Sequence, residues 1–275
     1  IEADSTGSSM EEKPDVEMAE NPFEPYIEPL RRQLENQEPV FLIGVIVALA
    51  VVISSCVFLK YFLSSKTVRS AVLLVGLCDS GKTLLFCRLL SGKFKRTQTS
   101  ITDSSAPYKA KSDRGSTWTL IDLPGHESLR SQYLEKFKST ARAIVFVVDS
   151  AIFQKEVRDV AEFLYDLLTD IVISRNAPAI IVACNKQDIT MAKSAKLIQQ
   201  QLEKELNTLR VTRSAALSSQ DGSIGGSMYL GKKGKDFEFG QLSMKVEFVE
   251  CSARGSKSED GDAELERLEK CLAKL

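Results

Sequence analysis

The chain has 275 residues, with 36 basic and 37 acidic side chains and a formal net charge of −1. This length allows one substantial core with appendages, and the near-neutral charge argues against a protein that binds nucleic acid directly through a basic surface. The six cysteines have no paired spacing, which excludes a disulfide framework or a zinc site and is typical of a reducing compartment.

The first 39 residues form an acidic tail. They contain 11 acidic and 3 basic residues, five of the eight prolines and no apolar periodicity. Such a segment cannot bury enough apolar surface to offset the cost of ordering, so we predict disorder over residues 1–39. The rest of the chain holds 33 basic and 26 acidic residues, an excess that suits work beside anionic lipid or charged machinery.

A run of 20 uncharged residues follows, from Val40 to Leu59. As a helix it would span about 30 Å, the thickness of the bilayer hydrocarbon. A buried core helix would carry a polar face, and a cleaved signal peptide would not follow 39 mostly acidic residues. We therefore predict one transmembrane helix over residues 40–63. Basic residues on both flanks favour a cytosolic C-terminal side only slightly.

From Arg69 onward, strand and helix patterns alternate over residues 64–275. This alternation predicts an α/β fold with a mostly parallel six-stranded sheet and helices on both faces. The predicted strands are Ala71–Val75, Tyr108–Lys111, Thr117–Leu123, Ala143–Asp149, Ala179–Cys184 and Val246–Glu250. The predicted helices are one after Thr83, Phe153–Ser174, Ala192–Leu209 and one containing Leu265, Leu268 and Leu272.

The stretch Gly76–Thr83 fits the phosphate-loop pattern G-x-x-x-x-G-K-[ST] between the first strand and a helix. Its backbone N–H groups and the helix dipole suit phosphate oxygens. Lys82 is expected to reach the β- and γ-phosphates as a catalytic group, and the Thr83 hydroxyl to bind Mg²⁺. The predicted nucleotide-contacting residues here are Gly76, Leu77, Cys78, Asp79, Ser80, Gly81, Lys82, Thr83 and Leu84.

The hydroxyl-rich segment Thr97–Thr102 precedes the second strand. One of its threonines is expected to close over Mg²⁺ and the γ-phosphate. We favour Thr99, with Thr102 as the alternative, because spacing does not separate the two. The predicted nucleotide contacts are Thr97, Gln98, Thr99 and Ser100.

The third strand ends in Asp122-Leu123-Pro124-Gly125-His126. The carboxylate of Asp122 points to the metal edge, where it can hold Mg²⁺ through water, and the Gly125 N–H can meet a γ-phosphate. His126, the only histidine, takes the place from which a residue can position the attacking water. We predict that His126 acts in catalysis.

The tetrad Asn185-Lys186-Gln187-Asp188 follows another apolar strand and predicts that the bound base is guanine. The Asp188 carboxylate can accept hydrogen bonds from N1–H and the exocyclic amine of guanine, a pair that adenine does not offer. Asn185 braces the loop and the stem of Lys186 packs on the purine. Ser252 and Ala253, after the last strand, would bring a backbone N–H to the guanine carbonyl.

Between Arg210 and Lys245 lies a stretch rich in Ser, Gly and Lys, without periodicity. We predict an exposed insertion, with disordered decoration favoured over a docking loop.

Taken in order, these motifs resemble those of a Ras-superfamily GTPase, nearest the Arf/Sar branch. A full membrane span before such a domain resembles the family of signal recognition particle receptor β subunits, over Val40 to the C-terminus. The alternative is a vesicle-trafficking GTPase of the Arf/Sar type, against which the span argues.

The motifs predict GTP or GDP and Mg²⁺ as ligands, and because both are available in the cytosol we expect the GTPase domain of this single-pass protein to be cytosolic. The resemblance implies that the membrane is that of the endoplasmic reticulum. It also implies the receptor α subunit as the partner, and indirectly the signal recognition particle, ribosome and translocon. Cys78 stands where many Ras relatives have Gly, and His126 where they have Gln. These departures predict slow hydrolysis without partners, or at the limit a GTP-holding scaffold.

Overall fold

The computed structural model describes residues 39–63, 69–110, 117–218, 229–255 and 262–275. Its contacts divide the chain into two units, residues 1–66 and 67–275. The predicted acidic tail, residues 1–38 of it, lies outside the described residues.

In the first unit, helix α2 spans Pro39–Leu63. Its described side chains, residues 43–58, are all exposed, including Ile46 and Phe58 at 65% and 64%. Within the described residues, no helix combines the length and the apolar character needed to cross a bilayer. The transmembrane helix over residues 40–63 therefore stays a prediction.

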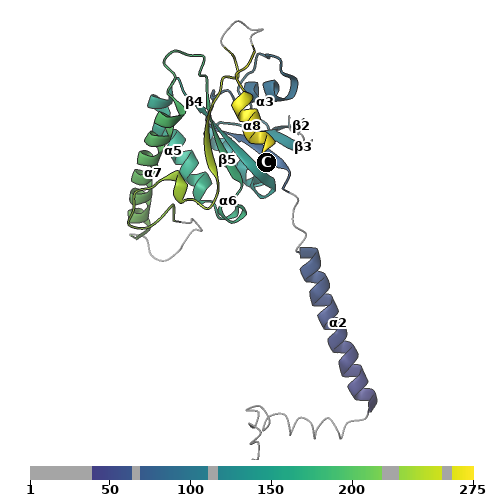
Figure 1. Ribbon diagram of the computed structural model, residues 1–275. Helices are drawn as coiled ribbons and strands as arrows, with labels where there is room; N and C mark the ends of the chain where they lie inside the picture. Colours follow the sequence, from purple (N-terminus) through teal and green to yellow (C-terminus); the bar gives the residue numbers. More distant parts are fainter. Residues whose placement is uncertain (1–38, 64–68, 111–116, 219–228, 256–261) are drawn as a thin grey trace, which may run out of the picture. The chain divides into compact units, whose positions relative to one another are not determined.

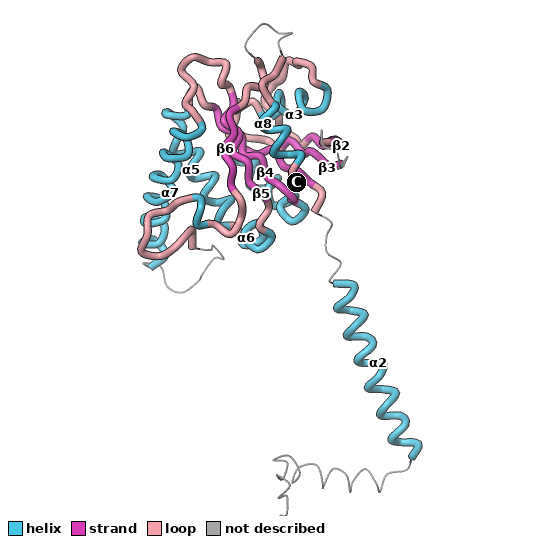
Figure 2. The backbone as a smooth tube through the Cα atoms, in the orientation of Figure 1, coloured by secondary structure: helices cyan, strands magenta, loops and turns pink. Residues whose placement is uncertain are grey.

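The second unit is built on a six-stranded sheet in the order β2-β3-β1-β4-β5-β6 (Figures 1 and 2). Only β2 is antiparallel to its neighbour, and all other pairs are parallel. The six-stranded, mostly parallel sheet is thus confirmed. The strands are β1 Ala71–Val75, β2 Ser104–Lys109, β3 Thr117–Asp122, β4 Ala141–Asp149, β5 Ala179–Asn185 and β6 Val246–Glu250.

Helices cover both faces of this sheet, as predicted. Buried side chains of α5 and α7 belong to one core cluster, and those of α3 and α8 to a second cluster on the other face. Figure 1 shows these two pairs on opposite sides of the strands. The helices are α3 Lys82–Ser91, α4 Glu127–Phe137, α5 Phe153–Thr169, α6 Ile171–Asn176, α7 Ala195–Ser218 and α8 Glu266–Ala273.

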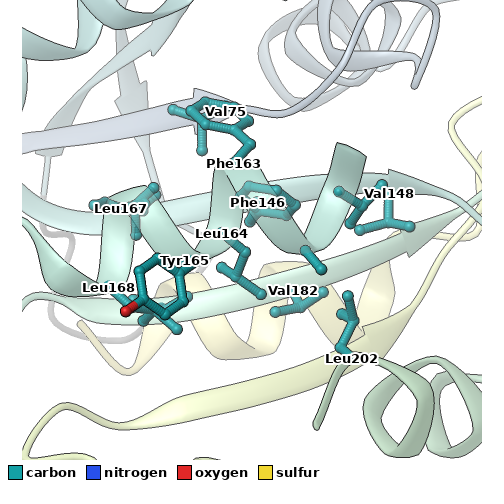
Figure 3. Close-up of a cluster of buried hydrophobic side chains, with 14 of the residues drawn as sticks. Val75, Phe146, Val148, Phe163, Leu164, Tyr165, Leu167, Leu168, Val182 and Leu202 are labelled. Carbon is teal, nitrogen blue, oxygen red and sulfur yellow. The ribbon is translucent and has the colours of Figure 1, made fainter. Parts of the chain in front are cut away.

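The larger core lies between the sheet and α5 (Figure 3). Phe146 of β4 meets Phe163 of α5 with ring centroids 5.4 Å apart, and Leu164 is fully buried beside them. Burial of one such side chain contributes about 1.5–3 kcal/mol, so this packing fixes where the strand ends lie. The carboxyl ends of β1, β3, β4, β5 and β6 meet at one edge, where open α/β sheets bind ligands.

The predicted helix Phe153–Ser174 is two helices, α5 and α6. Asp170 between them has extended backbone (φ −62°, ψ 130°), and its carboxylate accepts hydrogen bonds from the N–H groups of Val172 and Ile173. The residue is therefore an N-cap, and the apolar stripe alone did not reveal it.

Strand β2 begins four residues before the predicted strand at Tyr108 and includes Pro107. Proline is tolerated because β2 is an edge strand that pairs only with β3. The predicted end at Lys111 lies outside the described residues.

The prediction of an exposed insertion over Arg210–Lys245 is wrong for its described part. Helix α7 continues to Ser218, because no Gly or Pro interrupts residues 210–218. Beyond it, four apolar side chains enter the core without regular spacing: Leu230, Phe237, Phe239 and Met244.

Arg210 holds this segment in place. It is buried, and its guanidinium donates to the carbonyl oxygens of Leu230 and Lys235 at 3.4 and 2.7 Å. Carbonyl groups of this segment are thus bonded to a side chain and not to the backbone of a helix or strand. A segment held in this way needs no helical or strand period in its sequence, so the pattern did not reveal it.

Candidate functional site

A cavity of about 380 Å³ opens at the carboxyl edge of the sheet. Every residue that lines it was predicted to contact nucleotide: Cys78, Asp79, Gly81, Lys82, Thr83, Leu84, Thr97, Gln98, Thr99, Ser100 and Gly125. Thr99 is among them and its alternative Thr102 is not. The structure thus brings the phosphate loop, the hydroxyl-rich segment and the glycine after β3 around one space.

Two glycines allow the phosphate loop to turn this tightly. Gly76 has φ +144°, and a Cβ there would lie 2.3 Å from the Val147 carbonyl oxygen. Gly81 has φ +91°, and its Cβ would meet the Asn185 side-chain nitrogen at 2.4 Å. Side chains at either position would push the loop off β4 or off Asn185.

Lys82 is buried at the first position of α3, and its Nζ donates to the Leu77 carbonyl oxygen at 2.6 Å. Burial lowers the pKa of Lys82, and the nearby Asp122 carboxylate opposes this shift. The ammonium therefore sits within the loop beside the cavity, in a place where an anionic ligand would restore the solvation that burial removed.

Asp122 ends β3 and is fully buried. Its Oδ2 accepts a hydrogen bond from Thr83 Oγ1 at 2.7 Å, and that hydroxyl lies 2.9 Å from Ser100 Oγ. The second carboxylate oxygen, Oδ1, is buried with no hydrogen-bond partner, and burial raises the pKa of Asp122. One carboxylate with an unused oxygen beside two hydroxyls suits Mg²⁺, which binds few protein ligands and hard oxygens.

Gly125 touches the phosphate loop directly. A Cβ at Gly125 would lie 2.6 Å from Lys82 Nζ and 2.8 Å from the Cys78 nitrogen. Any side chain there would occupy the space between the loop and the cavity.

His126 lies elsewhere. It is exposed, does not line the cavity, and forms the N-cap of α4, where its Nδ1 accepts from the Ser128 N–H at 3.4 Å. Its catalytic role stays a prediction that this conformation does not support.

Asn185 joins the phosphate side to the base side. It is 1% exposed, its Nδ2 donates to the Ser80 carbonyl oxygen at 2.8 Å, and its Oδ1 accepts from the Ala253 N–H at 3.0 Å. The Ser252 N–H donates to Glu264. The two amides predicted to meet the guanine carbonyl are therefore engaged within the protein in this conformation.

The sequence reasoning missed Asp149, at the end of β4. Its carboxylate is buried and forms an ion pair of 2.6 Å with Nζ of Lys186, which itself has a left-handed backbone (φ +64°). This ion pair restrains the Lys186 side chain, whose stem was predicted to pack on the purine. An acidic residue at a strand end was the available signal.

Asp188 is held from one side. Ser252 Oγ donates to its Oδ1 at 2.6 Å, and the Gly255 N–H donates to the same hydroxyl at 2.9 Å. Two residues that were predicted separately, Asp188 and Ser252, are thus in direct contact, through the side chain of Ser252 and not its backbone N–H.

Comparison with known proteins agrees with this arrangement. The family model for the signal recognition particle receptor beta subunit matches residues 67–246. The chain belongs to this family. Mouse signal recognition particle receptor subunit beta is 62% identical over 253 residues, which cover 92% of this chain and 94% of the mouse protein.

Solved structures agree with this family. A chain in the structure of the mammalian SRP receptor is 64% identical, with a TM-score of 0.64, over 74% of this chain and 98% of its own length. A Chaetomium thermophilum structure described as SRb-GDP-Mg is 26% identical, with a TM-score of 0.55, over 77% and 99%. The SRP receptor β-subunit family thus includes a member observed with GDP and Mg²⁺.

Proposed function

We propose that this chain is a membrane-anchored GTP-binding subunit of the signal recognition particle receptor. In its GTP form it recruits the receptor α subunit to the endoplasmic reticulum membrane for co-translational targeting. The observation that carries the proposal is the cavity lined by the phosphate loop, in a chain of this family. Next to it, the buried Asp122 carboxylate is bonded to Thr83 of the lining and keeps one unused oxygen, and after β5 Asp188 is held by Ser252.

The first part of the proposal concerns the nucleotide and assigns a binding role to each residue of the candidate site. Lys82 and the loop amides hold the phosphates, while Asp188 and Lys186 take the guanine ring. Thr83, Asp122 and one hydroxyl of the cavity segment, Thr99 in our prediction, hold Mg²⁺, which would neutralise charge on the phosphates. Ser100 is the second candidate, since its hydroxyl is already 2.9 Å from that of Thr83.

We propose that the chain hydrolyses GTP slowly by itself. The expected group for positioning the attacking water, His126, is not among the described lining residues, and its Nδ1 accepts from the Ser128 N–H. Movement of His126 toward Gly125, or a group supplied by a partner, would complete the site.

The membrane half rests on the uncharged run Val40–Leu59. We propose that α2 anchors the chain with the second unit in the cytosol, where GTP and Mg²⁺ are available. The test is carbonate extraction of microsomes: the full chain stays in the pellet, and a variant lacking residues 40–59 is released. Retention of that variant would require a second attachment.

The decisive experiment is partner binding. The full chain in detergent is loaded with GDP or a non-hydrolysable GTP analogue, and its affinity for the purified α subunit is measured. We expect at least tenfold tighter binding of the GTP form, since only a differential interaction can produce a switch. Equal affinity would leave a nucleotide-holding scaffold, and α-subunit binding lost altogether would reopen the Arf/Sar alternative.

A further inference from the structure

Arg88 is a buried cation on α3, 5% exposed, six residues after Lys82. Its Nε donates to the Ala253 carbonyl oxygen at 3.0 Å, and its Nη2 to that of Arg254 at 3.2 Å. Its Nη1 donates to the Gly92 carbonyl oxygen at 2.8 Å, at the end of α3. One guanidinium therefore connects the helix that starts at the phosphate loop with the loop that follows β6.

The hydrogen bond to Arg254 has a consequence on the far side of the same peptide. A trans peptide is planar and points its N–H opposite to its carbonyl. By fixing the Arg254 carbonyl, Arg88 fixes the direction of the Gly255 N–H, which donates to Ser252 Oγ. Gly255 has φ +85°, a conformation that favours glycine.

The Ser252 hydroxyl carries the restraint to Asp188. Its single proton is donated to Asp188 Oδ1 at 2.6 Å, and its lone pairs accept from Gly255. Each hydrogen bond in this path therefore orients the group that forms the next one. The path runs from Arg88 through the 254–255 peptide and Ser252 to the carboxylate that the proposed function assigns to the base.

We propose that Arg88 is a positioning residue for guanine recognition, acting on the orientation of Asp188 toward the exocyclic 2-amino group of the purine. This inference rests on the proposed function, because the carboxylate matters only if a guanine nucleotide is bound. It assigns a base-selecting effect to a side chain on the phosphate-loop helix.

A purely structural role predicts something different. If Arg88 only stabilises the fold, its replacement weakens all nucleotides by one common factor. Inosine diphosphate lacks the 2-amino group of GDP and is otherwise the same ligand. The ratio of the two dissociation constants therefore reports the Asp188 contact and cancels general damage.

The experiment measures Kd for GDP and IDP with the full chain in detergent, for wild type, Arg88→Gln, Arg88→Lys and Ser252→Ala. We expect the preference for GDP over IDP to fall about fivefold to tenfold in Arg88→Gln, the effect of one hydrogen bond of about 1 kcal/mol. In Arg88→Lys we expect at least a threefold fall, since one ammonium cannot reproduce the planar fork. Arg158→Lys, on the exposed face of α5, is the matched control and should change nothing.

A double variant tests the path itself. Because both residues act on Asp188 in series, Arg88→Lys with Ser252→Ala should lower the preference no further than Ser252→Ala alone. Additive effects, or an unchanged GDP/IDP ratio in Arg88→Lys, would overturn the inference. Circular dichroism checks folding, and the lysine variant decides if Arg88→Gln is unfolded. Failure of the wild type to prefer GDP would instead refute the proposed function.

Discussion

The base side and the phosphate side of the candidate site differ in how their polar groups are satisfied. On the base side, Asp188, Lys186 and Asn185 each have a partner within the protein, at 2.6 to 3.0 Å. On the phosphate side, Lys82 turns back on its own loop and Asp122 keeps a buried oxygen without a partner.

This difference indicates how the base side and the phosphate side each respond to a bound nucleotide. On the base side, Asp188 and Lys186 are already held by the protein, so these two side chains can meet a base without rearrangement, which lowers the cost of binding. The phosphate side, with an unsatisfied buried carboxylate oxygen and a buried ammonium bonded to its own loop, gains most when metal and phosphate bind, so it is the half that can respond to the γ-phosphate.

The largest effect is expected from Lys82→Ala, which removes the buried cation of the phosphate side. Hydrogen bonds to charged groups contribute about 1.5–3 kcal/mol each, so we expect nucleotide affinity to fall about 100-fold or more. Isothermal calorimetry with GDP measures this, with the exposed Lys155→Ala on α5 as control. A loss no greater than that of the control would mean that the comparison of the two halves is mistaken.

Next in size is Asp188→Asn on the base side. It replaces an acceptor by a donor opposite the guanine amine, which should cost about 1–3 kcal/mol of GDP affinity and favour xanthosine diphosphate. Competition binding of the two nucleotides measures the change, with Asp159→Asn on α5 as the matched control. Unchanged preference would remove Asp188 from the base side.

A smaller effect is expected from Asp122→Asn, which leaves the shape of the site but removes the metal-binding charge. The gain in GDP affinity on adding Mg²⁺ should shrink about tenfold, or about 1.4 kcal/mol. In EDTA the variant should bind GDP no more weakly than wild type. Should the Mg²⁺ dependence survive intact, the orphaned oxygen does not serve the metal.

The smallest effect is expected at Asp170, which belongs to neither side of the site. Its replacement should change the stability of the fold without changing nucleotide binding. Burial tends to raise the pKa of Asp170, but the hydrogen bonds from Lys138 and the α6 amides outweigh it and lower the pKa below its ordinary value. The ionised Asp170 carboxylate therefore stabilises the folded state fully above its unfolded-state pKa of about 3.9. This stabilisation is lost as the pH falls through the lower pKa that Asp170 has in the folded state.

Asp170→Ala should thus lower the free energy of unfolding by about 1 kcal/mol at pH 7, the usual value of an N-cap, with GDP affinity unchanged. Urea unfolding of the full chain in detergent at pH 7 and pH 3 measures it, and the difference from wild type should narrow at pH 3. A difference that grew with acidity would contradict the assigned sign.

The sequence predicted the parts of this molecule that depend on local pattern. Strands β1 and β6 and the cavity lining follow from apolar runs and from motifs whose spacing reflects backbone geometry. Side chains that act over long distances in the chain were not predictable in this way. Asp149, Arg88 and Arg210 are each single polar residues with partners that are distant in the chain: Arg210 bonds Leu230, 20 positions away, Asp149 bonds Lys186, 37 away, and Arg88 bonds Arg254, 166 away.

The segment predicted as an insertion, residues 210–245, shows that buried residues can also lack any sequence period. Leu230, Phe237 and Phe239 are buried although they follow no period, because side chains of α7 supply hydrogen bonds that a helix or strand would have made internally. Arg210 donates to the carbonyl oxygens of Leu230 and Lys235, and the Phe237 and Phe239 N–H groups donate to Asn207 and Glu203. The break at Asp170 was missed for a related reason, since a cap inside an apolar stripe leaves the stripe unchanged.

Pro107 on β2 bears on how copies of the protein behave beside one another. Its partner Thr119 directs its N–H to Ser70, on the β1 side, so the Pro107–Thr119 pair is a non-hydrogen-bonded one. The ring nitrogen of Pro107 therefore faces outward, and the free edge of the sheet lacks a donor near its middle. A second β2 cannot form an unbroken ladder there, which protects the chain from edge-to-edge aggregation when many copies are crowded together.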